Sequence, residues 1–234
     1  NILNGIKTSI NSAFKQHEYM LNVLNESKIN GPSYLAKKRA SESLKKFEEI
    51  YDNDGQNVSY TLLTSSLFFL STLLHEHYKQ KVYILIDEYD APLNSSIDNE
   101  HYNLVLTTRR TILQSGLKNN PHLEMAIMTG ILKMAKADLF SGLNNFAEYN
   151  ILNKKYAEFF GFTAAEVESL LEDNLISADD AEEHNSQKEQ VANWYNGYRI
   201  GDYTIYNPWS IMHCLSKKNI APYWIKTGDD SLLR

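Results

Sequence analysis

The chain has 234 residues, and the 43% that are hydrophobic suffice to bury one large core or two small ones. A formal net charge of −6 argues against broad nonspecific binding of nucleic acid, because phosphate backbones need basic surfaces. The single cysteine, Cys214, excludes an internal disulfide, and no Cys/His cluster has zinc spacing. We therefore expect a globular protein of a reducing compartment, the cytoplasm.

Helices are predicted for the first part of the chain. Apolar residues at helical spacing predict one helix over residues 5–24, a second that Ser33 caps, and a third over about 60–79. The most apolar segment, 62–74, is shorter than the roughly 20 residues that a bilayer span needs. We interpret this segment as a core helix.

Two apolar strands are predicted next, over residues 82–86 and 123–130, with a helix over 101–117 between them. An order of helix, strand, helix and strand is typical of a parallel α/β sheet, and both strands are predicted to be buried. Active sites in such sheets lie at the carboxyl ends of the strands. We therefore expect the polar residues that follow the two strands to meet at one edge.

Asp87 and Glu88 follow the first strand directly, and Thr129 ends the second. A carboxylate at a strand end can hold Mg²⁺ through water, and a neighbouring Glu can align water for attack on a γ-phosphate. Thr129 either senses that phosphate or satisfies local backbone. The alternative for the two acids is an ordinary solvated strand end. Asp90 either supports the metal shell, pairs with a cation or caps the turn.

Basic residues that could meet a phosphate are few. Arg109 and Arg110 suit a phosphate or a developing negative charge, but their mid-helix position favours a solvated face or an ion pair. Arg199 either reaches a nucleotide or packs over aromatic rings, and Lys133 is more typical of a surface lysine. The chain contains no GxxxxGK[ST] loop, so half of an ATPase signature is missing.

The pattern changes after about residue 155. Thr163–Glu166 is a capping box that predicts a helix of about ten residues, and Ser186–Glu189 is a second box that predicts the start of another. A hairpin is predicted over 198–206, and Asn207-Pro208 predicts the start of a last helix. We interpret the aromatic residues of this region mainly as core: Trp194, Tyr195, Tyr198, Tyr203, Tyr206 and Trp209.

Six strings occur in order along the chain: LIDEYDAPLN, MTGILK, LFSGLNN, GFT, WYNGY and YNPWS. Together they resemble the predicted AAA-ATPase-like family of the P-loop NTPase superfamily, which is common in bacteria. The strings run from about residue 80 to near the end of the chain. The helical lead-in before them carries no motif of the family.

The resemblance implies an α/β fold with a partial P-loop NTPase-type parallel sheet flanked by helices, followed by a small helical region with a β-hairpin. Residues 1–155 would be the carboxyl-terminal part of the ATPase core, and 156–234 would be a lid-like region. Asp87 and Glu88 match the Walker B acids, Thr129 matches a sensor position, and Arg199 lies in the WYNGYR string. The implied cofactors are ATP and Mg²⁺.

A Walker A loop precedes these motifs in the family, whereas this chain starts at Asn1 within a helical pattern. We therefore expect a piece of a longer protein that is inactive alone. In the intact protein, ATP hydrolysis would drive or switch an interaction with an unknown protein partner. The alternatives are a non-hydrolysing nucleotide switch or interaction scaffold and, less favoured, a metal-dependent nuclease that uses Asp87, Glu88 and Asp90.

Nucleic acid would be bound only through domains outside this sequence, since many proteins of the family carry a nuclease domain further on. We expect no association with membranes.

Overall fold

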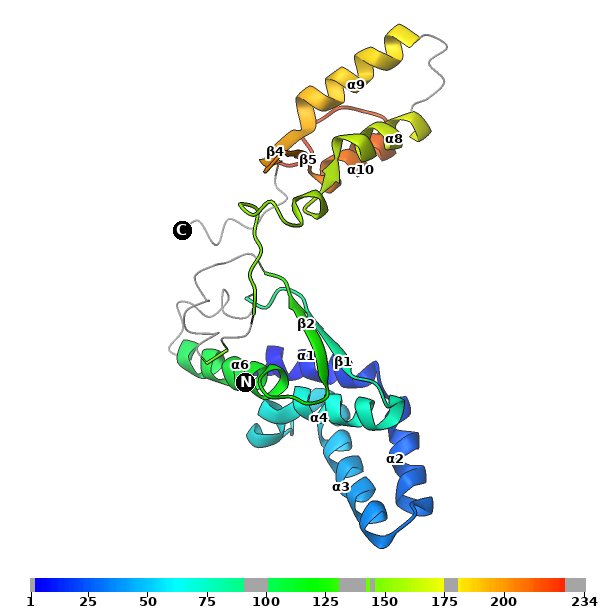
Figure 1. Cartoon of the computed structure of the whole chain (residues 1–234), viewed down its shortest axis with the longest axis vertical. Helices are drawn as coiled ribbons and strands as arrows, with labels where there is room; N and C mark the ends of the chain where they lie inside the picture. Colours follow the sequence, from blue (N-terminus) through cyan, green and yellow to red (C-terminus); the bar gives the residue numbers. More distant parts are fainter. Residues whose placement is uncertain (1–2, 91–100, 131–141, 144–145, 175–180, 226–234) are drawn as a thin grey trace. The chain divides into compact units, whose positions relative to one another are not determined.

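The computed structural model forms two compact units, residues 1–146 and 147–234, and each is described by itself (Figure 1). The described residues are 3–90, 101–130, 142–143, 146–174 and 181–225. The expected boundary near residue 155, between an ATPase core and a lid-like region, stays a prediction.

The first unit begins with helices, whose bounds are α1 Asn4–Lys15, α2 Tyr19–Asn30, α3 Tyr34–Tyr51, the short 3₁₀ helix η1 Asp52–Gly55, and α4 Tyr60–Tyr78. The prediction of one helix over 5–24 is wrong, because the chain breaks between Lys15 and Tyr19. Phe14 and Met20 are both buried, yet they would lie about 120° apart on a straight helix. The break lets both residues face the same core.

Side chains form hydrogen bonds with the backbone at both ends of α3. Ser33 caps α3 as predicted, since its Oγ accepts a hydrogen bond from the amide of Ala36 at 3.1 Å. Asn11 of α1 is 1% exposed, and its Nδ2 donates to the carbonyl oxygens of Ile50 and Tyr51, both at 2.8 Å. These carbonyls end α3 and have no partner within the helix. One buried amide therefore ties α1 to the end of α3.

Helix α4 lies in the core of the first unit, as predicted for the apolar segment 62–74. Leu63 is fully buried on it, and Leu70 and Leu74 belong to the same apolar cluster. Phe14 and Phe47 face each other in that cluster with ring centroids 5.0 Å apart. Among the described residues, no helix has both the length and the apolar character needed to cross a membrane.

The two predicted strands pair in parallel. β1 spans Val82–Ile86, β2 spans Leu123–Met128, and helix α6, Tyr102–Leu117, connects them in sequence. The face that carries Ile84 packs on the cluster to which α4 and α6 contribute. The prediction of fully buried strands is wrong, because the opposite face is exposed: Tyr83 57%, Leu85 73%, Met125 48% and Ile127 49%. An apolar run alone does not reveal whether one face or both are covered.

The second unit combines a small sheet with helices, whose bounds are η2 Ala157–Phe159, β3 Phe162–Thr163, α8 Ala164–Asn174, α9 Ala181–Tyr195, β4 Asn196–Ile200, β5 Tyr203–Tyr206 and α10 Pro208–Lys217. The predicted hairpin is confirmed, with a two-residue turn at Gly201-Asp202 and a left-handed φ of 61° at Gly201. β3 adds a third, antiparallel strand beside β5. This short strand was not predicted.

Of the three helix caps that the sequence predicts in the second unit, two are confirmed and one is wrong. The Thr163–Glu166 box is confirmed, because Glu166 Oε2 accepts from the Thr163 amide at 2.8 Å and Thr163 Oγ1 accepts from the Glu166 amide at 3.3 Å. The hydrogen bonds that the Thr163 amide and hydroxyl donate to the Glu166 carboxylate lower the pKa of Glu166. Asn207 caps α10 with Pro208 in its first turn. Ser186 is not a cap, because α9 already begins at Ala181.

The interpretation of the aromatic residues as core holds only for some of them. Tyr195 and Tyr206 are 4% and 7% exposed and belong to the apolar cluster of the second unit, together with Cys214. The prediction is wrong for four others, which are exposed: Trp194, Tyr198, Tyr203 and Trp209. Tyr198 and Tyr203 lie on a hairpin, whose side chains alternate between two faces, and Trp194 and Trp209 lie on helices that have an outer face, so composition does not decide which rings turn inward.

We expect Asn11→Leu to lower the free energy of unfolding by about 1–3 kcal/mol, because the end of α3 would keep two buried carbonyls without a donor. Asn25→Leu, at an exposed position of α2, is the matched control and should change stability by less than about 0.5 kcal/mol. Urea unfolding followed by circular dichroism measures both. Equal effects of the two substitutions would contradict the role of Asn11.

Candidate functional site

The carboxyl ends of β1 and β2 bring two of the predicted residues together. The hydroxyl of Thr129 donates a hydrogen bond to Oδ1 of Asp87. Pairing of the backbones continues past the strands, because the Thr129 amide donates to the Ile86 carbonyl and the Tyr89 amide donates to the Thr129 carbonyl, both at 2.9 Å. The expected meeting of polar residues at one edge is thus found for Asp87 and Thr129.

The backbone turns sharply between the two acids. Glu88 has a left-handed φ of 49°, a conformation that costs a residue with a Cβ about 1–2 kcal/mol. Its amide donates to Asp87 Oδ1 at 3.0 Å, so this oxygen accepts both an amide and the Thr129 hydroxyl. The two bonds fix the orientation of the Asp87 carboxylate. Both acidic side chains remain exposed to solvent.

We call residues 87–90 the acid turn. Its last residue, Asp90, is only 2% exposed, in contrast to the two solvated acids before it. Gly130 lies against this end of the turn, where a Cβ would come within 2.5 Å of Tyr89 Cε1 and 2.8 Å of Asp90 Oδ1. The fit of Gly130 was missed from the sequence, although a glycine directly after a strand was a visible signal.

Arg109 of α6 does not lie on the solvated face that was one of its two predicted positions, while the ion pair, the other alternative, stays a prediction. Its side chain is half-buried, and burial lowers the pKa of its guanidinium while the charge of Asp90 opposes that change. Among the described residues, its Nη1 is buried without a hydrogen-bond partner. The signal was the helical spacing of Val105, Arg109 and Ile112, which places the arginine on the apolar stripe.

The acids suit a metal held mainly by water. Within the described ranges, no group of three or more His, Cys, Asp or Glu residues could hold a metal ion. Asp87 offers one exposed, oriented carboxylate, and Mg²⁺ is commonly bound through one or two carboxylates with waters and substrate phosphates in the other positions. The residues present therefore fit a water-rich Mg²⁺ site better than a cage built from protein ligands.

Other predicted site residues lie elsewhere. Arg199 belongs to the second unit, where it is exposed on β4 and pairs with Thr204 of β5. Lys133 and most of the LFSGLNN string fall outside the described residues. The Asp87–Thr129 edge is thus built from the first unit alone.

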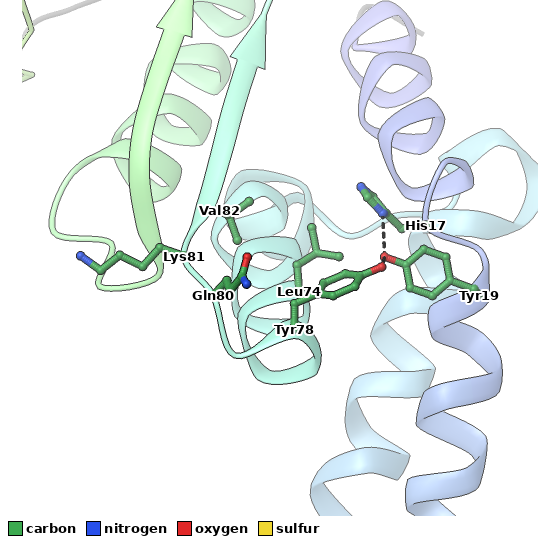
Figure 2. Close-up of a pocket in the computed structure, with 7 residues that line it drawn as sticks. All are labelled: His17, Tyr19, Leu74, Tyr78, Gln80, Lys81 and Val82. Atoms are coloured by element: carbon green, nitrogen blue, oxygen red, sulfur yellow. Dashed lines mark hydrogen bonds between the residues drawn. The ribbon is translucent and has the colours of Figure 1, made fainter.

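A cavity of about 210 Å³ lies at the amino end of β1, where Val82 begins the strand (Figure 2). Tyr78 donates a hydrogen bond to the Tyr19 hydroxyl at 3.0 Å, and His17 Nδ1 lies 3.2 Å from the same oxygen. Burial, followed by the bond to Tyr78, raises the pKa of Tyr19 to about 12. The cavity is at the opposite end of β1 from Asp87 and takes no part in the acid edge.

Comparisons with known proteins match most of the first unit. A family model described as "Predicted AAA-ATPase" matches residues 6–140. The chain is also similar to an uncharacterized protein in the vnfD 5′ region of Azotobacter chroococcum mcd 1, with 28% identity over 155 residues. That stretch is 66% of this chain but 28% of the relative, so the chain spans well under half of the relative's length. No solved structure gives a significant match.

We expect Gly130→Ala to destabilise the first unit by about 1–3 kcal/mol, because the added Cβ would push into Tyr89 and Asp90. The matched control is Gly5→Ala in α1, where a Cβ would meet nothing within 4 Å. The control should leave stability unchanged or raise it by up to about 1 kcal/mol. Thermal unfolding compares the two variants, and a neutral Gly130→Ala would show that the acid turn is not packed against Gly130.

Proposed function

The chain belongs to the predicted AAA-ATPase family, and we propose that within its full-length protein it forms part of an ATP-binding, Mg²⁺-dependent ATPase. One observation carries the proposal, the hydrogen bond between Thr129 and Asp87 at the carboxyl ends of two parallel strands. Nucleotide hydrolases of the P-loop class use an acid at this position for the metal and a neighbouring polar residue for the attacking water. Hydrolysis would drive or switch binding of a protein partner.

Each residue of the edge has a separate proposed role. Asp87 would hold Mg²⁺ through water, with its carboxylate oriented by the Glu88 amide and the Thr129 hydroxyl. When bound, Mg²⁺ supplies positive charge that neutralises the phosphate oxygens. Glu88 would accept a hydrogen bond from the attacking water, and its exposure leaves the carboxylate accessible. Thr129 would respond to the γ-phosphate through the same hydroxyl that contacts Asp87.

The remaining parts of a nucleotide site would come from elsewhere in the protein. No GxxxxGK[ST] segment occurs in these 234 residues, and such a loop normally supplies a lysine and the backbone amides that surround the phosphates. Arg199, exposed on β4, is the proposed contact from the second unit to the nucleotide. The second unit would serve as a lid or as the surface for the protein partner.

The sequence leaves two other functions open for this chain. A non-hydrolysing nucleotide switch or interaction scaffold would keep the same fold. Only a measurement of ATP hydrolysis distinguishes it from an ATPase. A metal-dependent nuclease would need Asp87, Glu88 and Asp90 to face one metal. The burial of Asp90, set against the exposure of the other two acids, weighs against that arrangement. The ATPase therefore remains the function that we propose.

We expect Glu88→Gln in the full-length protein to bind ATP normally while the rate of hydrolysis falls about 100-fold or more, because glutamine cannot accept the proton of the attacking water. Glu124→Gln, at an exposed position of β2, is the control and should keep normal turnover. Nucleotide binding by fluorescence and phosphate release measure the two properties. Unchanged hydrolysis in Glu88→Gln would exclude Glu88 as the residue that orients water.

The gene sequence upstream of the codon for Asn1 offers a second test. We expect it to encode a GxxxxGK[ST] segment between a strand and a helix, because phosphate binding needs its amides and lysine. Substitution of that lysine by alanine should abolish ATP binding, measured by equilibrium dialysis. Absence of the segment from the whole gene would rule out a hydrolysing enzyme and favour the scaffold.

A further inference from the structure

The connection between α2 and α3 forms an exposed end of the first unit. The two helices pack side by side, and their connection projects away from α4 (Figure 1). We call residues 28–39 the α2–α3 tip, and we propose that this tip binds a protein partner through an acidic surface that also carries apolar groups. The inference supplies the chemistry of the partner that the proposed function invokes, and in that respect it rests on that function. The second unit would then keep the role of a lid.

Three large apolar side chains are exposed to water at the α2–α3 tip. Ile29 lies in the last turn of α2 and is 66% exposed, while Tyr34 and Leu35 begin α3 and are 83% and 54% exposed. Among the described residues, the apolar cluster of the first unit includes Leu24 of α2 and Leu44 of α3 but none of these three. Single exposed apolar residues are ordinary, whereas a group at a projecting end indicates a binding surface.

Basic residues flank the three apolar side chains. The segment 27–41 contains Lys28, Lys37, Lys38 and Arg39 and no Asp or Glu, although the whole chain has a net charge of −6. All four basic side chains are exposed, and in the described part of the chain none of them forms an ion pair. A partner with an acidic surface would be complementary to this charge.

The cations near the start of α3 do not stabilise that helix. Aligned peptide dipoles place partial positive charge at the amino end of a helix, so acidic residues are favourable there and basic residues are not. The first turn of α3 has no acidic residue, and Lys37, Lys38 and Arg39 all lie within residues 34–39. A local preference that is broken without a gain in stability is typical of a functional site. The dipole and the three cations attract an anionic group together.

The turn of the α2–α3 tip is held in one conformation. Gly31 has no room for a Cβ, which would come within 2.6 Å of the carbonyl oxygen of Ser27. Pro32 follows it, and Ser33 caps α3 through the amide of Ala36. A turn fixed by a glycine, a proline and a cap loses little conformational entropy when a partner binds. The exposed residues on both sides of the turn are therefore presented in a preorganised arrangement.

A lipid surface and a nucleic acid also carry negative charge, but both fit the α2–α3 tip less well than a protein. Residues 30–33 form the polar connection at its end, and lipid offers no hydrogen bonds to their backbone groups. Ile29 and Leu35 have no aromatic ring on which a base could stack. An apolar centre with a polar rim is instead the usual composition of a protein interface.

The experiment selects binders of the full-length protein from a library of short random peptides, without nucleotide. We expect the selected peptides to be enriched in Asp and Glu next to Leu, Phe or Trp. Tyr34→Ser and Lys38→Glu should each weaken binding of the synthetic peptides about tenfold or more, measured by fluorescence anisotropy. The matched controls are Leu104→Ser, at an exposed apolar residue of α6, and Lys45→Glu, at an exposed position further along α3. Each control should change binding less than about twofold.

Thermal unfolding checks that the four variants keep their fold. All four substitutions are at exposed positions, so we expect the melting temperature of each to shift by less than about 3 °C. Tyr34→Ser and Lys38→Glu test the apolar and the charged part of the tip separately. If one of them unfolds, the other still decides whether the peptides bind at the tip.

Several outcomes would overturn the inference. Selected peptides without an excess of acidic residues would do so, as would peptides that bind Tyr34→Ser and Lys38→Glu as tightly as wild type, or a selection that yields no binder. Vesicles of phosphatidylcholine with phosphatidylglycerol and a DNA duplex test the other two classes, and binding to either that Tyr34→Ser abolishes would assign the tip to that class instead. A full-length protein that binds or hydrolyses no ATP would refute the proposed function alone, because these assays contain no nucleotide.

Discussion

The parallel pairing of β1 with β2 is the interaction on which the candidate site depends. Each strand is short, and alone neither would hold a side chain in a defined direction. Their register aligns Ile86 with Met128, so the chain leaves both strands at the same edge, and backbone hydrogen bonds continue to Tyr89 and Thr129. Asp87 and Thr129, 42 positions apart in the sequence, become hydrogen-bond partners because of that register.

The supporting layer explains how so small a sheet keeps its register. One face packs on an apolar cluster that includes residues of α4 and α6, and the burial of Ile84 fixes which side of β1 points inward. The same α6 carries Arg109, which is half-buried next to the packed residues Val105 and Ile112 of that helix. The exposed face, with Leu85 and Ile127, adds nothing to this packing.

Helix and strand types followed from local patterns, whereas several boundaries did not. The caps at Ser33, Thr163 and Asn207 were predictable because a cap is a contact within three residues. The break after Lys15 was not predictable, because it depends on packing against a core formed by helices that are distant in the sequence. The prediction that Ser186 caps a helix was wrong, because a short sequence that matches a capping box can also lie inside a helix, as it does in α9.

By itself, the sequence determined the order of most helices and strands, the mixed α/β class and the segment in which the acids occur, because these depend on periodicity and on neighbouring residues. Tertiary structure alone decided that Thr129 meets Asp87, that Asp90 is buried while Glu88 is exposed, and that Arg109 faces inward. These facts depend on strand register and helix packing, which join residues far apart in the chain. A local sequence pattern does not reveal contacts between residues that are far apart in the chain.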